Sequence, residues 1–209
     1  MKYSHIIIEG NIGAGKTTVS KMLAKQFNAN LILEEFEEND FLPKFYENKE
    51  RFAFSVELSF LADRYHQLTR KLEKDKLTIG DYYIVKSLIF AEVTLDKEEY
   101  LLYKRIYDIM HEKTKRPELL VYLDLPTEKL LEQIKMRGRS YELDIKSDYL
   151  EKIKEGYFSF FNTQKELTVV VLNCENVDLV GNAQHYSKFL EILNTTYLIG
   201  THFIDFNKA

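Results

Sequence analysis

The 209-residue chain has one cysteine, three prolines and no tryptophan. A lone cysteine cannot form an internal disulfide, and Cys174 lies in the apolar run VVVLNC, so the sequence suits a reducing compartment. The first apolar run is too short for a signal peptide, and no run approaches the length of a membrane-spanning helix. We therefore expect a cytoplasmic protein that has no membrane partner.

The chain also lacks an excess of positive charge. Its net charge is −4, with 30% charged and 45% hydrophobic residues, which argues against nucleic acid as a partner. It has no internal repeat, no low-complexity tract and no linker rich in proline, glycine or serine. Because this length suits one large domain, we expect a single domain over residues 1–209.

Short apolar runs alternate with amphipathic stretches along the chain. The apolar runs predict five strands, at residues 3–9, 30–33, 77–81, 118–126 and 167–173. Helical spacing predicts helices at residues 16–27, 51–73, 84–93, 98–112, 127–137, 144–161 and 184–193. This alternation indicates an α/β fold, with a parallel sheet of about five strands and helices on both faces. The apolar tail from residue 197 remains unassigned.

The segment GNIGAGKTT, residues 10–18, matches the phosphate-binding pattern G-x-x-x-x-G-K-[ST]. Its glycines let backbone N–H groups curl around phosphate oxygens, and the next helix points its positive end at them. We expect Lys16 to reach the β- and γ-phosphates and Thr17 to bind Mg²⁺. The apolar strand before the motif and the amphipathic helix after it support a nucleotide site formed by Gly10, Asn11, Ile12, Gly13, Ala14, Gly15, Lys16, Thr17 and Thr18.

Several classes of protein use such a loop. A GTPase would need Asn-Lys-x-Asp after a late strand, where this chain has NCENVD. A mechanical ATPase usually needs a longer chain. A small-molecule kinase needs an acceptor base, a cation-rich lid and an acceptor pocket, and the sequence offers a candidate for each.

The acceptor base is expected at the end of the second strand, where Glu34 and Glu35 stand. Ligands of a parallel sheet lie beyond the carboxyl ends of its strands, and a carboxylate there can take the proton of an acceptor hydroxyl. A solvated acidic turn is the alternative. Arg137 and Arg139 flank a glycine and suit a mobile lid over about residues 137–145; a basic helix end at the surface is the alternative there.

Two further pairs of residues carry candidate roles. Asp81 and Asp124 lie at or near the ends of the third and fourth strands, and either could hold Mg²⁺ through water. Glu57 and Arg64 are nearly two helical turns apart, about 10 Å along the axis. A planar base fits between them, with Phe60 or Phe90 on its face. A pair of surface charges is the alternative.

Five segments, taken in order over about residues 5 to 160, resemble the deoxynucleoside kinase family, most of all its bacterial deoxyadenosine/deoxyguanosine kinase branch. They are GNIGAGKTT, EEFEEN, FAFSVELSFLADRYHQL, GDYYIVKSLIFAE and RGRSYE. The resemblance implies a P-loop kinase fold with five parallel strands. It also implies an ATP–Mg²⁺ donor, transfer to the 5′-hydroxyl of a deoxynucleoside, and a homodimer.

The resemblance also assigns roles to individual residues. It makes Glu34 the catalytic base, with Glu35 as second choice, and makes Asp81 the better metal-site candidate. It places Tyr46 and Glu142 on the 3′-hydroxyl of the sugar. The remaining matches are Phe90 as the aromatic ring that stacks on the base and Glu57 with Arg64 as the base-reading pair.

Two positions depart from the family pattern. The residue after Asp81 is usually arginine and is Tyr82 here, and the first lid arginine is replaced by Gln133. Both departures remove a cation from the phosphate region. They put the neutralisation of the phosphates in question, with Lys135 as a candidate replacement.

Glutamate at position 57, where the family often has glutamine, bears on the choice of base. An ionised carboxylate only accepts hydrogen bonds, and guanine offers it N1–H and N2–H₂, with O6 and N7 left for the arginine. Adenine and cytosine present a lone pair instead. The sequence therefore favours deoxyguanosine, with deoxyadenosine or deoxyinosine still open. A nucleoside monophosphate kinase of the thymidylate type and a non-catalytic nucleotide-binding module are the alternative functions.

Overall fold

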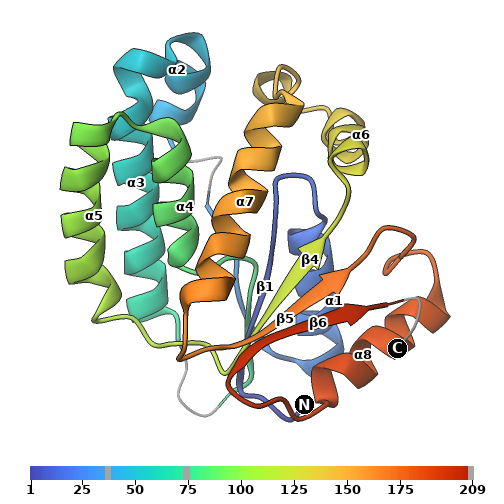
Figure 1. Ribbon diagram of the computed structural model, residues 1–209. Helices are drawn as coiled ribbons and strands as arrows, with labels where there is room; N and C mark the ends of the chain where they lie inside the picture. The colour runs from blue at the N-terminus through green and yellow to red at the C-terminus, as the bar shows by residue number, and fades with distance from the viewer. Residues whose placement is uncertain (36–38, 73–75, 207–209) are drawn as a thin grey trace.

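The computed structural model describes residues 1–35, 39–72 and 76–206, and Figure 1 shows its layers. Its strands are β1 (His5–Gly10), β2 (Asn30–Ile32), β3 (Thr78–Gly80), β4 (Leu119–Asp124), β5 (Thr168–Asn173) and β6 (Gly200–Asp205). They form one parallel sheet in the order β2-β3-β1-β4-β5-β6. The predicted α/β fold is confirmed, and the sheet has one strand more than the five expected.

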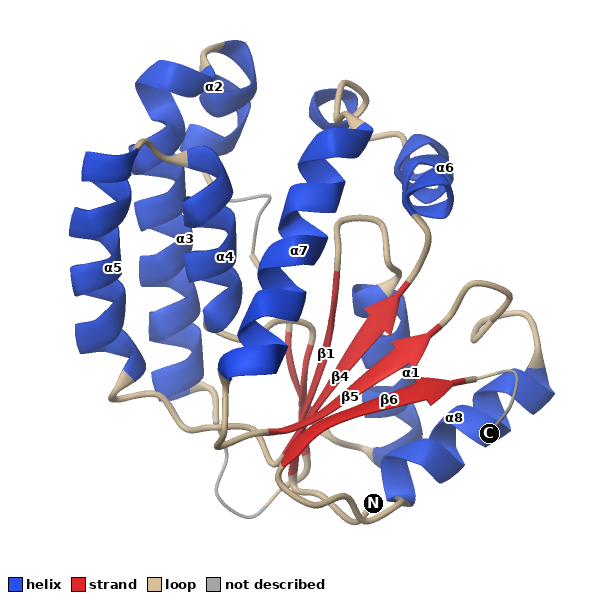
Figure 2. Ribbon diagram, viewed as in Figure 1, coloured by secondary structure: helices blue, strands red, loops and turns tan. Residues whose placement is uncertain are grey.

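Eight α-helices and one 3₁₀ helix lie in the described ranges. They are α1 (Lys16–Phe27), α2 (Phe41–Glu47), α3 (Lys49–Arg70), α4 (Val85–Thr94), α5 (Lys97–His111), α6 (Thr127–Arg137), the 3₁₀ helix η1 (Ser140–Glu142), α7 (Ser147–Thr163) and α8 (Ala183–Asn194). Figure 2 shows α1 and α8 on one face of the sheet and α3, α4, α5 and α7 on the other. None of the helices in this part of the chain is long and apolar enough to cross a membrane.

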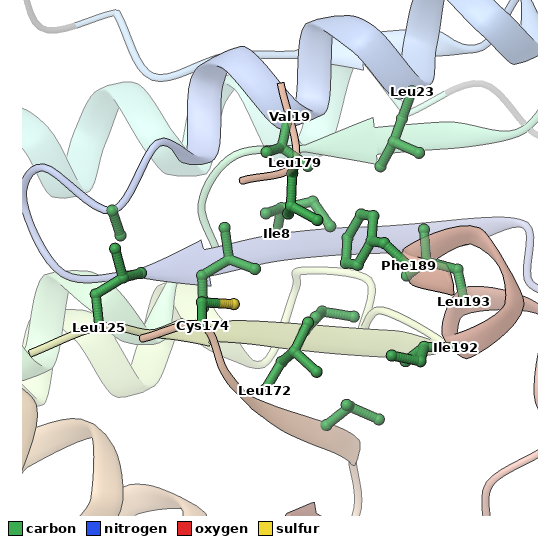
Figure 3. Close-up of a cluster of buried hydrophobic side chains, with 14 of the residues drawn as sticks. Ile8, Val19, Leu23, Leu125, Leu172, Cys174, Leu179, Phe189, Ile192 and Leu193 are labelled. Carbon is green, nitrogen blue, oxygen red and sulfur yellow. The ribbon is translucent and has the colours of Figure 1, made fainter. Parts of the chain in front are cut away.

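The strands separate two apolar cores because successive side chains of a strand point to opposite faces. On β1, Ile6 and Ile8 pack in the core under α1 and α8, part of which Figure 3 shows. Ile7, between them, packs in the core formed with α3, α4, α5 and α7. All three isoleucines are fully buried, so β1 is anchored from both sides where it leads into the glycine-rich loop.

Two elements differ from the sequence-based expectation. The tail left unassigned contains β6, which pairs with β5 from Thr168↔Gly200 to Asn173↔Asp205. Helix α2 was not predicted, because Pro43 interrupts its short apolar pattern. Pro43 stands in the first turn, where a missing N–H costs little. The predicted helix 51–73 is α3, which ends at Arg70, and the expected end at Glu73 falls outside the described residues.

Candidate active site

The glycine-rich loop joins the end of β1 to the start of α1, as its motif requires. Gly13 and Gly15 have φ of +85° and +81°, backbone that favours glycine. A Cβ on Gly13 would stand 2.7 Å from the carbonyl oxygen of Leu130 on α6, so this turn also packs against the helix that leads to the lid. The predicted strand–loop–helix context of the phosphate motif is confirmed.

Lys16 lies at the first position of α1 and folds back over the loop. Its Nζ donates a hydrogen bond to the Asn11 carbonyl oxygen at 2.8 Å. Removal from water and, second to it, the nearby Lys86 ammonium lower the pKa of Lys16 to about 8. An ammonium with few protein partners beside a ring of backbone N–H groups is suited to bind phosphate oxygens.

The candidate metal site is formed by Thr17 and Asp81. Thr17 Oγ1 donates to Asp81 Oδ2 at 2.5 Å, and Asp81 Oδ1 accepts from the backbone N–H of Glu34 at 2.8 Å. Asp124 instead pairs with Lys154 of α7, with Nζ 2.5 Å from Oδ1. Of the two aspartates that position alone left open, the structure brings Asp81 next to the phosphate loop.

The donor chemistry at Thr17 and Asp81 fits Mg²⁺. Both supply hard oxygen atoms, and Mg²⁺ in kinase sites takes one or two protein oxygens together with phosphate and water. The described residues hold no cluster of three or more histidines, cysteines or acidic residues suited to a metal. In such a site the phosphates of a bound nucleotide would supply further ligands.

Glu34 is held by two buried cations. Its Oε1 accepts from Arg64 Nε at 2.9 Å and from Nη2 at 2.5 Å, and its Oε2 lies 2.5 Å from Lys86 Nζ. Burial by itself would raise the pKa of Glu34, but the Lys86 ammonium and the Arg64 guanidinium outweigh it and hold that pKa well below its usual range. The carboxylate is therefore ionised and fixed in orientation.

Glu35 has different surroundings. It is exposed and pairs with Lys71, with Nζ 2.5 Å from Oε1, and both side chains are nearly half exposed. Only Glu34 of the two lines the pocket described next. The structure thus separates the first-choice base from the second, with Glu34 inside the site and Glu35 at the surface.

One pocket gathers the predicted catalytic and substrate residues at the carboxyl ends of the strands. Figure 1 shows α2 and α6 beyond this end of the sheet. The residues that were predicted and that line the pocket are Ile12, Lys16, Thr17, Glu34, Tyr46, Glu57, Phe60, Arg64, Asp81, Phe90, Arg137, Arg139 and Glu142. They come from segments spread over 131 positions of the chain (from 12 to 142), so their convergence is a result of the fold.

The lid predicted at about residues 137–145 begins at the end of α6. Gly138 caps that helix with φ +70°, and η1 places Glu142 against both arginines. Arg137 Nη2 pairs with Glu142 Oε2, and Arg139 Nη1 lies 3.2 Å from Glu142 Oε1. The lid also approaches α2, because the rings of Tyr46 and Tyr141 lie 5.5 Å apart between centroids.

The deep end of the pocket is formed by α3 and α4. Glu57 and Arg64 are only 5% and 4% exposed, so the alternative of a surface charge pair is wrong. Burial raises the pKa of Glu57 to about 7, against the opposing effect of Arg64. Arg64 Nη1 also donates to Ser87 Oγ at 2.7 Å. Within the described residues, the two bonds to Glu34 and the one to Ser87 use three of the five N–H groups of the Arg64 guanidinium. Two N–H groups remain for a ligand.

Aromatic rings line the same end of the pocket. Both Phe60 and Phe90 line it, with the guanidinium carbon of Arg64 5.0 Å from the Phe60 ring centre. Lys86 Nζ lies 5.3 Å from the centre of the Phe90 ring. A flat heteroaromatic group is therefore expected between ring faces and the polar atoms of α3.

Lys86 is the site residue that the sequence analysis missed. It lies in the first turn of α4, is 5% exposed, and lines the pocket. Tyr82, where the family pattern has arginine, is fully buried and donates through its hydroxyl to Gln67 Oε1 at 2.5 Å. The sequence around Lys86 gave no signal for this role, because Tyr82 precedes α4 and the four-residue spacing is not one helical turn.

Gln133, the second departure, lies beside the phosphate loop. Its Oε1 is 3.9 Å from the place that a Cβ on Gly15 would take. An amide at this position carries no charge, so it contacts the loop without replacing the missing cation.

Comparison with known proteins agrees with this geometry. The family model described as Deoxynucleoside kinase matches residues 6–197. The chain belongs to the deoxynucleoside kinase family. It is accordingly a kinase, a phosphotransferase that acts on a nucleoside.

Individual relatives of this kinase carry different substrate names. It is 36% identical to the deoxyguanosine kinase of Bacillus subtilis, over 88% of this chain and 92% of that protein. It is 31% identical to the deoxyadenosine/deoxycytidine kinase of the same organism, over 87% of each chain. The structure of deoxyadenosine kinase from M. mycoides with bound dATP matches with a TM-score of 0.80 at 25% identity, covering 91% and 99% of the two chains.

Proposed function

We propose that this kinase transfers the γ-phosphoryl group of ATP to the 5′-hydroxyl of a purine deoxyribonucleoside, with deoxyguanosine as its best substrate. The products are ADP and the 5′-monophosphate. The observation that carries the proposal is the convergence of the phosphate loop, the clamped Glu34 and the buried Glu57 on one pocket.

The donor side rests on the phosphate loop and the lid. The loop N–H groups and Lys16 would hold the phosphates of ATP, and Arg137 and Arg139 would add positive charge to the transferring group. Thr17 and Asp81 would hold Mg²⁺, which neutralises charge on the β- and γ-phosphate oxygens when it is bound. Phosphoryl transfer asks a protein mainly for position and charge, which these residues supply.

The acceptor side rests on Glu34. Its carboxylate is ionised, so it can accept a hydrogen bond from the 5′-hydroxyl and then its proton. Because the transition state of phosphoryl transfer is loose, orientation of the nucleophile matters more than strong basicity. Tyr46 and Glu142 would hold the 3′-hydroxyl at the mouth of the pocket, between α2 and the lid.

The preference for guanine rests on Glu57. As a carboxylate it accepts from N1–H and N2–H₂ of guanine, and two donors from the ligand favour its ionised form despite burial. Arg64 and Phe90 line the same pocket, so the arginine would donate to O6 and N7 of the base and the ring would stack on its face. The similarity to a deoxyguanosine kinase at 36% identity supports this choice. The relatives named for deoxyadenosine show that the base varies among the proteins this chain resembles.

The decisive experiment compares kcat/KM for deoxyguanosine, deoxyadenosine, deoxycytidine and thymidine with ATP as donor. We expect deoxyguanosine to lead by about tenfold or more, in line with the net contribution of one hydrogen bond to a charged group. A lead for deoxyadenosine or deoxycytidine would contradict the base assignment. Activity only on dGMP or dTMP would establish a monophosphate kinase, and ATP binding without any turnover would establish a binding module. The homodimer stays a prediction, for which sedimentation is the measurement.

A further inference from the structure

The proposed reaction gives no role to Lys86, which lines the pocket. Its Nζ lies 2.5 Å from Glu34 Oε2 and acts electrostatically on Lys16, where its effect on the pKa is second only to burial. The Lys86 ammonium is therefore near both the group that would take the acceptor proton and the group that would hold the donor phosphates. This is the region in which a γ-phosphoryl group would pass between them.

Lys86 and Arg64 together exceed the charge of the carboxylate that they hold. Arg64 alone already gives Glu34 two hydrogen bonds, and Lys86 adds a second positive charge to one negative charge. The further charged side chains around this cluster are Glu9 of β1, Lys16 of the phosphate loop, Glu57 of α3 and Asp81 after β3.

We propose that Lys86 is a second catalytic lysine, which holds Glu34 before the reaction and binds the transferred phosphoryl group during it. The inference rests on the proposed function. It also accounts for the loss of a cation at Tyr82, because Lys86 in the first turn of α4 supplies a charge four residues later, while the Tyr82 side chain is buried in the core.

In this step the 5′-oxygen of the nucleoside forms a bond to the γ-phosphorus of ATP. The bond from that phosphorus to the β,γ-bridging oxygen breaks, and its electron pair leaves with ADP. The hydroxyl proton moves to Glu34. Once Glu34 is neutral, the Lys86 ammonium has lost its anionic partner, and the new phosphate oxygens replace it.

The test uses Lys86→Met, which keeps the length of the side chain and removes its charge, and Lys86→Arg, which keeps the charge. We expect Lys86→Met to lower kcat by about 100-fold or more, with KM for ATP changed much less. Lys86→Arg should retain kcat within about tenfold. Lys71→Met is the matched control, because Lys71 pairs with the exposed Glu35 outside the pocket, and it should leave kcat unchanged.

Separate measurement of kcat, KM and stability distinguishes a catalytic role from a structural one. A lysine that binds the transferred phosphoryl group acts in the transition state, so its loss should lower kcat while KM for the nucleoside and for ATP changes much less. A counter-ion that serves folding alone would change the melting temperature and leave kcat of the folded variant near that of the unmodified kinase. Unchanged kcat in Lys86→Met would overturn the proposal.

A variant that fails to fold and an inactive unmodified kinase would each need a separate interpretation. If Lys86→Met does not fold, Lys86→Gln is measured in its place, with the same expected loss of kcat, and a Gln variant with normal kcat would overturn the proposal. If the unmodified kinase phosphorylates no nucleoside, the proposed function has failed. If it is active and the variants match it, only the role of Lys86 has failed.

Discussion

Thr17 and Asp81 are 64 positions apart in the chain, and Thr17 Oγ1 lies 2.5 Å from Asp81 Oδ2. The bond ties the first turn of α1 to the residue that follows β3. Asp81 also accepts from the backbone N–H of Glu34, so the candidate metal site and the candidate base share one carboxylate. A substitution at Asp81 is therefore expected to affect both metal binding and the position of Glu34.

Replacing Asp81 with asparagine removes the charge and keeps the shape. We expect the Mg²⁺ concentration for half-maximal activity to rise by about 10-fold or more, because loss of a metal-orienting carboxylate weakens metal affinity by 10- to 100-fold. Titration of Mg²⁺ at a fixed ATP concentration measures this half-maximal concentration. Asp124→Asn is the control, since Asp124 pairs with Lys154 instead. Identical titrations for the two variants would contradict the assignment of Asp81.

Glu34→Gln removes the proton acceptor. We expect kcat to fall by about 10²- to 10⁴-fold, the range for loss of a general base. The variant should still fold and bind ATP, with a lower melting temperature, because the buried Arg64 and Lys86 lose their counter-charge. Glu35→Gln is the neighbouring control and should leave kcat unchanged, because Glu35 lies at the surface with Lys71. A loss in Glu35→Gln with normal turnover in Glu34→Gln would transfer the role to Glu35.

Base preference should depend on pH through Glu57. Burial raises the pKa of Glu57 to about 7, so the carboxyl is mostly neutral below that pH and mostly ionised above it. The neutral form can donate to adenine N1, and the ionised form only accepts, which suits guanine. The ratio of kcat/KM for deoxyguanosine over deoxyadenosine should therefore rise between about pH 6 and pH 8.

Glu57→Gln provides the comparison for that experiment. Glutamine has no charge to lose, so the ratio should become independent of pH and shift toward deoxyadenosine. A ratio in the unmodified kinase that stays flat over the same range would show that Glu57 does not read the base by its charge.

Tyr46→Phe tests how the sugar is held. The ring should stay against Tyr141, whose centroid is 5.5 Å away, while the hydroxyl is lost. We expect kcat/KM for deoxyguanosine to fall by about fivefold to tenfold, in line with one hydrogen bond. Activity on 2′,3′-dideoxyguanosine, which has no 3′-hydroxyl to bind, should change little. An equal fall for both nucleosides would place Tyr46 away from the 3′-hydroxyl.

Much of the fold and of the candidate site could be predicted from local sequence patterns. The phosphate loop follows from nine consecutive residues, and Glu34 and Asp81 follow from their places after apolar strands, because the carboxyl ends of parallel strands meet at one edge. Burial of Glu57 and Arg64 could not be read from their spacing alone. It depends on α4 and α5 packing against α3, and these helices lie later in the chain.

The missed features depend on contacts between distant segments. Lys86 acquires its role from Glu34, which lies 52 positions earlier, and no pattern around Lys86 records that distance. Strand β6 was missed because GTHFID has little of the apolar character of the other strands. Its side chains are partly exposed at the edge of the sheet, so its pairing with β5 decides its structure.

The contact between Gly13 and the Leu130 carbonyl has a consequence for motion. Helix α6 packs against the phosphate loop at Gly13, where a Cβ would stand too close to the Leu130 carbonyl oxygen, and the lid arginines follow seven and nine residues later in the chain. A displacement of the loop by an arriving or leaving nucleotide would press on this helix. We therefore expect the position of the lid to depend on the state of the donor site.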